Sequence, residues 1–188
     1  MRRRQLVTAL GTAGIGGLAG CAGPTGETPG EFSVSSPTLA SGGSLPTRFT
    51  CYGAGVSPPF AVDRVPEPTA ALAVIGEYDS GGITDPVFWT LWNVSPDAER
   101  IPAGLPRTAT VASLDGARQG RAEGGEPGYE PPCPQPGQRY TNRFQVYALG
   151  ERLDVAGGTD HDTASEAIGD AVLASRRVTV DFERTPTP

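Results

Sequence analysis

The sequence has no lysine, and its 188 residues include only one histidine, one methionine and three cysteines. All 15 basic residues are arginines, and they face 21 acidic residues. A net negative chain with no basic region beyond its first residues cannot neutralise a phosphate backbone, which excludes nucleic-acid binding. An acidic composition without lysine is typical of proteins that stay soluble in high salt, so we predict a halophilic source. A GC-rich genome would produce the same preference for arginine.

The common catalytic motifs are also missing. The sequence contains no G-x-S-x-G elbow, no phosphate-binding loop, no dinucleotide fingerprint and no zinc-type spacing of histidine and cysteine. A Ser-His-Asp triad would need His161, which we expect at the surface just before a helix. Asp79 and Asp85 could do acid–base chemistry, but no spacing rule supports such a pair. We therefore predict a protein that is not an enzyme and has no cofactor and no metal site.

The N-terminus predicts an exported lipoprotein. Three arginines at 2–4 precede an apolar run at 6–18, which is shorter than the roughly 20 residues of a membrane span. Residues 18–21, Leu-Ala-Gly-Cys, are typical of a lipoprotein processing box, and residues 3–7 also fit a twin-arginine export signal. We expect residues 1–21 to be a signal peptide with lipid on Cys21, anchoring the chain to the outer face of the cell membrane. The alternative is an ordinary secretory signal with a chance cysteine.

Processing before Cys21 would remove three of the 15 arginines and no acidic residue, leaving 12 arginines against 21 acidic side chains and a formal charge of −9. Residues 22–30 have the composition of a flexible tether. Residues 31–183 suffice for one domain that buries roughly 70% of its unfolded surface. Residues 184–188 are predicted to be a disordered tail.

Short apolar runs bounded by glycine and proline dominate this domain, and they favour a mainly β fold with long, shaped loops. The run 70–76 is nearly all apolar and should be a central strand. Residues 177–182 alternate apolar with polar side chains and should have one buried face. The predicted strands are 32–35, 48–50, 70–76, 88–94, 143–149 and 177–182.

One helix is predicted over 163–175, with Asp162 or Thr163 as its N-cap and Glu166 in its first turn. Its apolar face should turn toward the sheet. That face would carry Ala164, Ile168, Val172 and Leu173.

The connection 102–138 is long and poor in hydrophobic residues, so we expect it to carry a function or a stabilising device. With Cys21 assigned to lipid, Cys51 and Cys133 are left as a pair in an oxidising compartment. A disulfide between Cys51 and Cys133 would close a loop of about 80 residues, and it would contribute roughly 4.5 kcal/mol in the chain-entropy model. Two free, buried thiols are the alternative.

A series of segments in matching order resembles the phosphatidylethanolamine-binding protein family, in its prokaryotic YbhB/YbcL or Raf kinase inhibitor-like branch. Residues 49–53 and 56–60 resemble its "YTCDG…SPPL" segment, and 119–137 its "QGRNDFG..GYGGPCPPPG" stretch. The other matching segments are 42–46, 65–75, 92–94, 101–106 and 147–149. The resemblance implies a β-sandwich of a large and a small antiparallel sheet with one or two short peripheral helices. It also implies a small pocket at one end for phosphate-like anions.

The family's pocket histidines are replaced in this chain. Phe88 stands at the first histidine of the family, and Tyr140, or Gln138 if the alignment slips, at the second. Asp79 is the closest match to the carboxylate that orients those histidines, with Glu77 or Asp85 as alternatives. The ligand-binding residues predicted from the resemblance are Pro58, Asp79, Phe88, Trp89, Tyr129, Pro132 and Tyr140.

The function predicted from these residues is that of an exported, membrane-anchored, non-catalytic binding protein. Its altered pocket would take a small anionic or phosphorylated ligand, such as a phospholipid headgroup. Arg139 or Arg143 would replace the histidines, because a guanidinium suits phosphate and carboxylate. The alternative is an interaction protein that inhibits an extracellular protease through its loops, with aromatic side chains filling a vestigial pocket.

Overall fold

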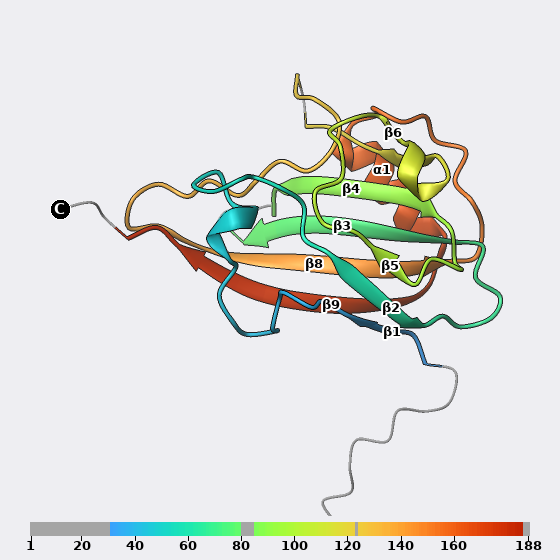
Figure 1. Cartoon of the computed structure of the whole chain (residues 1–188). Helices are drawn as coiled ribbons and strands as arrows, with labels where there is room; N and C mark the ends of the chain where they lie inside the picture. Colours follow the sequence, from blue (N-terminus) through green and yellow to red (C-terminus); the bar gives the residue numbers. More distant parts are fainter. Residues whose placement is uncertain (1–30, 80–84, 123, 186–188) are drawn as a thin grey trace, which may run out of the picture.

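A computed structural model describes residues 31–79, 85–122 and 124–185. The predicted signal peptide, Cys21 and the tether lie outside these residues. Two antiparallel sheets pack face to face, and one helix covers the far side of the larger sheet (Figure 1). The β-sandwich predicted from the resemblance is confirmed. Within the described part of the chain, no helix is long and apolar enough to cross a membrane.

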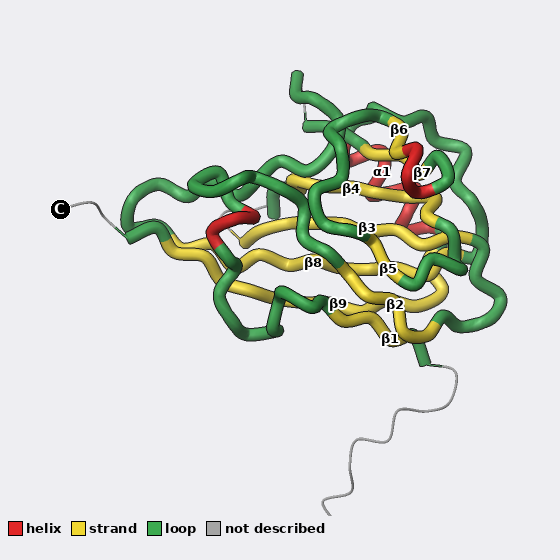
Figure 2. The backbone as a smooth tube through the Cα atoms, in the orientation of Figure 1, coloured by secondary structure: helices red, strands yellow, loops and turns green. Residues whose placement is uncertain are grey.

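The small sheet has three short strands in the order β1-β2-β5, which are Ser33–Ser35, Phe60–Arg64 and Arg100–Ile101. The large sheet has six strands in the order β6-β7-β4-β3-β8-β9 (Figure 2). Its bounds along the chain are β3 Ala71–Asp79, β4 Val87–Val94, β6 Thr110–Val111, β7 Ala117–Gln119, β8 Arg139–Leu149 and β9 Val172–Glu183.

β3 is central, as its apolar run predicts. It pairs with β4 on one side and with β8 on the other, from Ala71 opposite Leu149 to Asp79 opposite Thr141. Leu72 and Val74 point into the core between the sheets, while alternate residues face the helix. Both faces of the strand are therefore covered, which explains why the sequence has almost no polar residue there.

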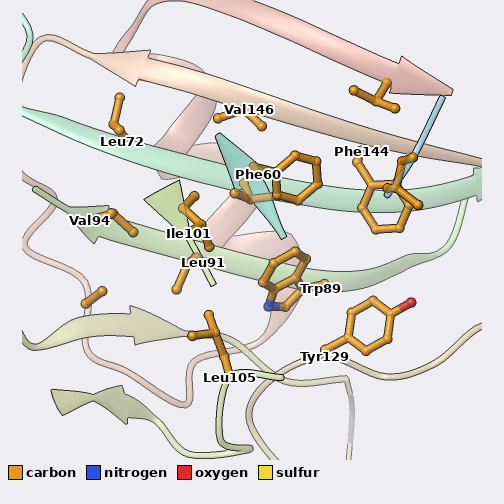
Figure 3. Packing of buried hydrophobic residues seen from close by; sticks show 14 of the residues in the cluster. Phe60, Leu72, Trp89, Leu91, Val94, Ile101, Leu105, Tyr129, Phe144 and Val146 are labelled. Atoms are coloured by element: carbon orange, nitrogen blue, oxygen red, sulfur yellow. The ribbon is translucent and has the colours of Figure 1, made fainter. Parts of the chain in front are cut away.

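The main core lies between the two sheets (Figure 3). Phe60 of the small sheet packs on the large sheet, with its ring centroid 6.4 Å from Trp89 and 5.9 Å from Phe144. Tyr129, from the long connection, closes the same core with its ring perpendicular to Trp89 at 5.6 Å. Large aromatic rings therefore fill the end of the sandwich where the candidate site lies.

The helix α1 spans His161–Asp170, so the prediction of 163–175 is wrong at both ends. Its N-cap is Asp160, whose Oδ1 accepts a hydrogen bond from the Thr163 amide at 2.8 Å. Val172 already belongs to β9, opposite Leu149 of β8, and both Val172 and Leu173 are exposed. Pairing with a long neighbouring strand overrides the helical pattern here. Ala164 and Ile168 are buried, as predicted.

The predicted strand at 48–50 is also wrong. Thr47–Phe49 forms the 3-10 helix η1, which follows Pro46, and Ala112–Leu114 forms a second one, η2. The Thr50 hydroxyl donates a hydrogen bond to the Thr47 carbonyl at 2.9 Å. Such local side-chain bonds compete with strand pairing. The strands β2, β5, β6 and β7 escaped prediction because they are short or carry polar residues on one face.

The predicted disulfide between Cys51 and Cys133 is confirmed, with the two Cα atoms 5.3 Å apart and a sequence separation of 82. It joins the loop after η1 to the loop before β8. Arg184 was expected in the disordered tail, but its guanidinium lies 4.5 Å from the Tyr52 ring centroid and its amide bonds to Gln138. The ordered domain therefore extends past residue 183.

Candidate functional site

A hollow of about 260 Å³ opens at the end of the sandwich, where β3, β4 and β8 meet the disulfide-linked loop. We call it the end pocket. Its lining residues are Tyr78, Pro86, Val87, Phe88, Ala122, Glu130, Pro131, Pro132, Cys133 and Tyr140.

Three aromatic rings from three neighbouring strands form one wall of the end pocket. The Tyr78 ring is stacked on Tyr140, at 4.4 Å between centroids and 10° between planes. On its other face, Tyr78 is stacked on Phe88 at 5.9 Å and 23°. Both faces of the Tyr78 ring are therefore covered by neighbouring rings.

Phe88 reaches this wall because β4 contains a bulge. Gly76 pairs with Trp89 and Glu77 with Val87, which leaves Phe88 as the extra residue. The bulge turns the consecutive side chains Phe88 and Trp89 toward the same core. Gly76 makes room for the ring, since a Cβ there would lie 2.7 Å from Phe88 Cε2. The position of the Phe88 ring therefore depends on the bulge in β4 and on Gly76 in β3.

Three of the seven predicted ligand-binding residues line the end pocket, namely Phe88, Pro132 and Tyr140. Trp89 is fully buried and donates a hydrogen bond from Nε1 to Gln119 Oε1 at 3.0 Å. Tyr129 is buried and donates from its hydroxyl to the Phe49 carbonyl at 2.6 Å.

The remaining two, Pro58 and Asp79, lie outside the lining: Pro58 is buried, and Asp79 is exposed on the side of β3 where Arg143 lies. Sequence reasoning missed Tyr78 and Glu130. Tyr78 shares the inward face of β3 with Gly76, and that two-residue alternation is the signal that could have found it.

The two arginines expected to hold an anion are engaged elsewhere. Arg143 donates to Glu77 Oε1 at 2.9 Å, pairs with Asp85, and lies 4.0 Å from Asp79 Oδ2. Arg139 pairs with Asp181. Both arginines are odd-numbered residues of β8, whereas the strand presents Tyr140 and Phe144 to the pocket and core. Strand alternation therefore directs the guanidinium groups to the opposite face, and neither lines the end pocket.

Among the described residues that line the end pocket, only Glu130 has a charged side chain. Its amide donates to the Phe88 carbonyl at 2.9 Å, which fixes the residue beside the aromatic wall. The pKa of Tyr78 is raised above its usual value by burial first, and then by the nearby acidic groups of Tyr140 and Glu130. The end pocket is therefore aromatic and acidic, the reverse of an anion site.

A second hollow of about 460 Å³ adjoins the end pocket and shares Pro86, Val87 and Ala122 with it. Arg121, Asp160, His161 and Asp162 complete its lining, at the N-terminus of α1. We call it the helix-end hollow. Among the described residues, no group of three or more histidine, cysteine, aspartate or glutamate side chains is placed to hold a metal ion.

His161 is buried, so the prediction of a surface histidine is wrong. Its Nδ1 lies 3.0 Å from the Thr90 hydroxyl, and its amide donates to the Arg121 carbonyl at 3.0 Å. Gly120 leaves space for this pair, because a Cβ there would lie 3.1 Å from Nδ1. Burial lowers the pKa of His161 to about 4, and Asp162 and Asp160 oppose this shift only in part. The imidazole is therefore neutral near pH 7.

Comparison with known proteins agrees with this fold. The family model for phosphatidylethanolamine-binding proteins matches residues 35–183. A UPF0098 protein of Methanothermobacter thermautotrophicus is 32% identical over 137 residues, which cover 72% of this chain and 88% of the relative. A candidate lipoprotein of Mycobacterium tuberculosis, LppC, is 31% identical over 154 residues, covering 80% of this chain and 72% of the relative.

The crystal structure of Escherichia coli YbcL, described as a member of the mammalian PEBP family, superimposes with a TM-score of 0.74 at 26% identity. The match covers 81% of this chain and 98% of YbcL. Two sheets of three and six antiparallel strands, one peripheral helix and a small end pocket are thus found together with a family match over most of the domain. The chain belongs to the phosphatidylethanolamine-binding protein family.

Proposed function

We propose that this chain is an exported, lipid-anchored, non-catalytic binding protein that takes a small molecule in its end pocket. The observation that carries the proposal is the aromatic wall of Tyr78, Phe88 and Tyr140, three rings on adjacent strands facing a disulfide-linked loop. Because the rings are stacked and the loop is cross-linked, the pocket needs little rearrangement to receive a ligand.

Anchoring at the membrane is supported by the processing box that ends at Cys21 and by the similarity to the M. tuberculosis candidate lipoprotein. Residues 22–30 have the composition of a flexible tether between that anchor and the domain. The domain would then work close to the outer membrane face and sample ligands there.

The non-catalytic part of the proposal is supported by the surroundings of His161. Its hydroxyl neighbour, Thr90, is fully buried, and His161 itself is 5% exposed. A molecule in the helix-end hollow could touch the edge of the imidazole, but it could not reach the fully buried Thr90 hydroxyl. The pair is better explained as an internal hydrogen bond that fixes α1 against β4.

An anionic or phosphorylated ligand, as predicted from the sequence, finds little support in the described lining. Desolvating an anion requires N–H donors or positive charge. Arg139 and Arg143 lie on the other face, and Glu130 would repel an anion. The ligand that we propose is therefore small, but it is not an anion.

The test is thermal unfolding of the full chain in detergent with a panel of small amines, alcohols, carboxylates and phosphate esters. A ligand of the folded state stabilises it by RT ln(1 + [L]/Kd), so the melting temperature rises with the logarithm of ligand concentration once the concentration exceeds Kd. Tyr140→Ala should abolish the shift, whereas Gln145→Ala, on the outward face of the same strand, should preserve it. Absence of any shift in the wild type, or an equal shift in Tyr140→Ala, would refute the proposal.

Loop-based inhibition of an extracellular protease is the second candidate, favoured by the cross-linking of the loops around Cys51 and Cys133. A preorganised loop binds with a smaller entropy cost. Inhibition of secreted proteases by Tyr140→Ala as strong as by the wild type would support it.

A further inference from the structure

We propose that the helix-end hollow binds a free α-amino acid, whose carboxylate pairs with Arg121 and His161 and whose ammonium group pairs with Asp162. These three residues line the hollow at the N-terminus of α1. None of them lines the end pocket, so the second site is independent of the proposed function.

His161 supplies a buried polar group that has no protein partner. Its imidazole lines the helix-end hollow, although the residue is only 5% exposed. Nδ1 lies 3.0 Å from the Thr90 hydroxyl, whereas Nε2 is buried and has no hydrogen-bond partner within the described part of the chain. Because an unpaired buried group is unfavourable, a ligand that pairs with Nε2 gains affinity.

The contact with Thr90 determines which imidazole nitrogen carries the hydrogen. If the Thr90 hydroxyl donates to Nδ1, the hydrogen is on Nε2, and Nε2–H is the one group of this pair left without a partner. In the opposite tautomer, the hydroxyl hydrogen and the Nε2 lone pair would both lack a partner among the described residues. The first arrangement leaves fewer buried groups unpaired. Nε2 is therefore a donor that suits a carboxylate oxygen.

Arg121 provides a fixed positive charge beside this donor. Its amide donates to the Thr159 carbonyl at 2.9 Å, and its carbonyl accepts from the His161 amide at 3.0 Å. Its Nε donates to the Gly158 carbonyl at 2.8 Å, and the two terminal guanidinium nitrogens have no partner among the described residues. A guanidinium with free N–H groups suits a carboxylate.

Two carboxylates in the same lining argue against a simple anion as the ligand. Both oxygens of Asp160 accept hydrogen bonds from Thr163, at 2.8 Å from its amide and 3.0 Å from its hydroxyl. Asp162 is exposed and has no hydrogen bond or ion pair from its side chain to the described residues. Burial lowers the pKa of His161, and Asp162 and Asp160 oppose this shift, so both carboxylates lie within electrostatic reach of the ring.

The balance of charges therefore favours a zwitterion. A ligand with only a carboxylate would be repelled by Asp160 and Asp162, and a ligand with only an ammonium group would be repelled by Arg121. A molecule that carries both groups can satisfy the guanidinium, the Nε2–H group and the Asp162 carboxylate together.

The size and the apolar part of the hollow indicate the side chain of the ligand. A volume of about 460 Å³ lies within the roughly 300–1,000 Å³ typical of small-molecule sites. Pro86, Val87 and Ala122 provide an apolar surface beside the charged groups. Valine, with its small apolar side chain, is therefore a suitable probe.

The first experiment is calorimetric titration of the full chain with valine, 3-methylbutanoate and 2-methylpropylamine at one fixed ionic strength. The second probe lacks the ammonium group of valine, and the third lacks its carboxylate. Valine should bind at least about tenfold more tightly than either, because each fragment loses a charge-assisted contact. A fragment that binds as tightly as valine, or no binding of valine, overturns the inference.

The second experiment locates the ligand through His161, which is the only histidine in the sequence. A ¹⁵N-labelled chain without a histidine tag therefore gives one set of imidazole nitrogen signals. At pH 7 these should show the hydrogen on Nε2, and saturation with valine should shift the Nε2 signal. A hydrogen on Nδ1, or binding of valine that leaves Nε2 unchanged, contradicts the inference.

The variants test the two charged contacts. Arg121→Gln and Asp162→Asn should each weaken valine binding about tenfold. Their matched controls are Arg107→Gln, on the same long connection, and Glu166→Gln, one turn further along α1; both residues are exposed, and both variants should bind valine like the wild type. Melting temperatures verify that each variant is folded. Asp162 is exposed, so Asp162→Asn stays informative even if Arg121→Gln unfolds. Wild-type affinity in a folded Arg121→Gln or in Asp162→Asn overturns the inference.

A failure of this inference is distinguishable from a failure of the proposed function. A ligand of the end pocket loses its binding in Tyr140→Ala, whereas an amino acid in the helix-end hollow loses its binding in Asp162→Asn. The two variants change different linings, so each result counts for one site alone.

Discussion

Acid should destabilise this protein through His161 in particular. In the unfolded chain the imidazole takes up a proton with a pKa near 6.5, whereas burial lowers the pKa in the folded protein to about 4. Between these values the unfolded state binds more protons, so stability is full above pH 6.5 and falls as the pH drops toward 4. The charged and titratable groups lining the same hollow are Asp160, Asp162 and Arg121.

The size of the effect follows from the two pKa values. A full shift from 6.5 to about 4 corresponds to about 3 kcal/mol, since one pKa unit equals 1.36 kcal/mol. Between pH 7 and pH 5 the loss should be about 2 kcal/mol. That is a large share of the roughly 5–15 kcal/mol stability of a typical domain.

The assay is urea unfolding of the wild type and of His161→Gln at pH 7, 6 and 5. Glutamine can still hydrogen-bond with Thr90 but does not titrate. Carboxyl groups with lowered pKa values, such as Asp160 and Asp181, also make the free energy of unfolding depend on pH, but they do so equally in both proteins. The wild type should therefore lose about 2 kcal/mol more than the variant between pH 7 and pH 5. Parallel curves for the two proteins would show that His161 is not buried in its neutral form.

Three further predictions concern the scaffold and the anchor. Replacing Cys51 and Cys133 together by alanine should lower the free energy of unfolding by about 2–4.5 kcal/mol in non-reducing urea titrations, and a reductant should then have no further effect. Gly76→Ala should cost about 1–3 kcal/mol in the same assay, because its Cβ meets the Phe88 ring, and Phe88→Leu in the same chain should recover part of that loss. Cys21→Ser should move the protein from the membrane fraction to the soluble fraction on cell lysis; an unchanged distribution would exclude lipidation at that residue.

The parts of the fold that were predictable are those where one local pattern decides the structure. Residues 70–76 are apolar because β3 is covered on both faces, and the alternation of Val178 with Val180 reflects the one buried face of β9. The disulfide followed from counting cysteines in a chain that the sequence predicts to be exported. In each case the structural requirement restricts the residue types at nearby positions, so the pattern can be recognised in the sequence.

The parts that were not predictable depend on contacts between distant segments. Val172 and Leu173 fit a helical face, but eleven residues of β8 across from β9 decide for a strand. His161 is buried because Gly120 and Thr90, far away in sequence, leave space for its ring.

The candidate site was predictable only in part, for the same reason. The sequence identified Phe88 as a departure from the family pattern. The direction of its side chain could not be predicted, because it depends on a bulge that forms where β4 pairs with β3. Arg143 was assigned to the pocket because its charge suited an anion. The register that places it opposite Glu77 is a property of two strands and cannot be read from either one.

The disulfide has a consequence for when the protein becomes active. Cys133 lines the end pocket, and its partner Cys51 lies in the loop after η1. While the thiols are reduced, as in the cytoplasm, the wall carrying Glu130 and Pro132 lacks its covalent tie. If the chain is exported as proposed, the ligand affinity of the end pocket should be higher in the oxidised protein than in the reduced protein.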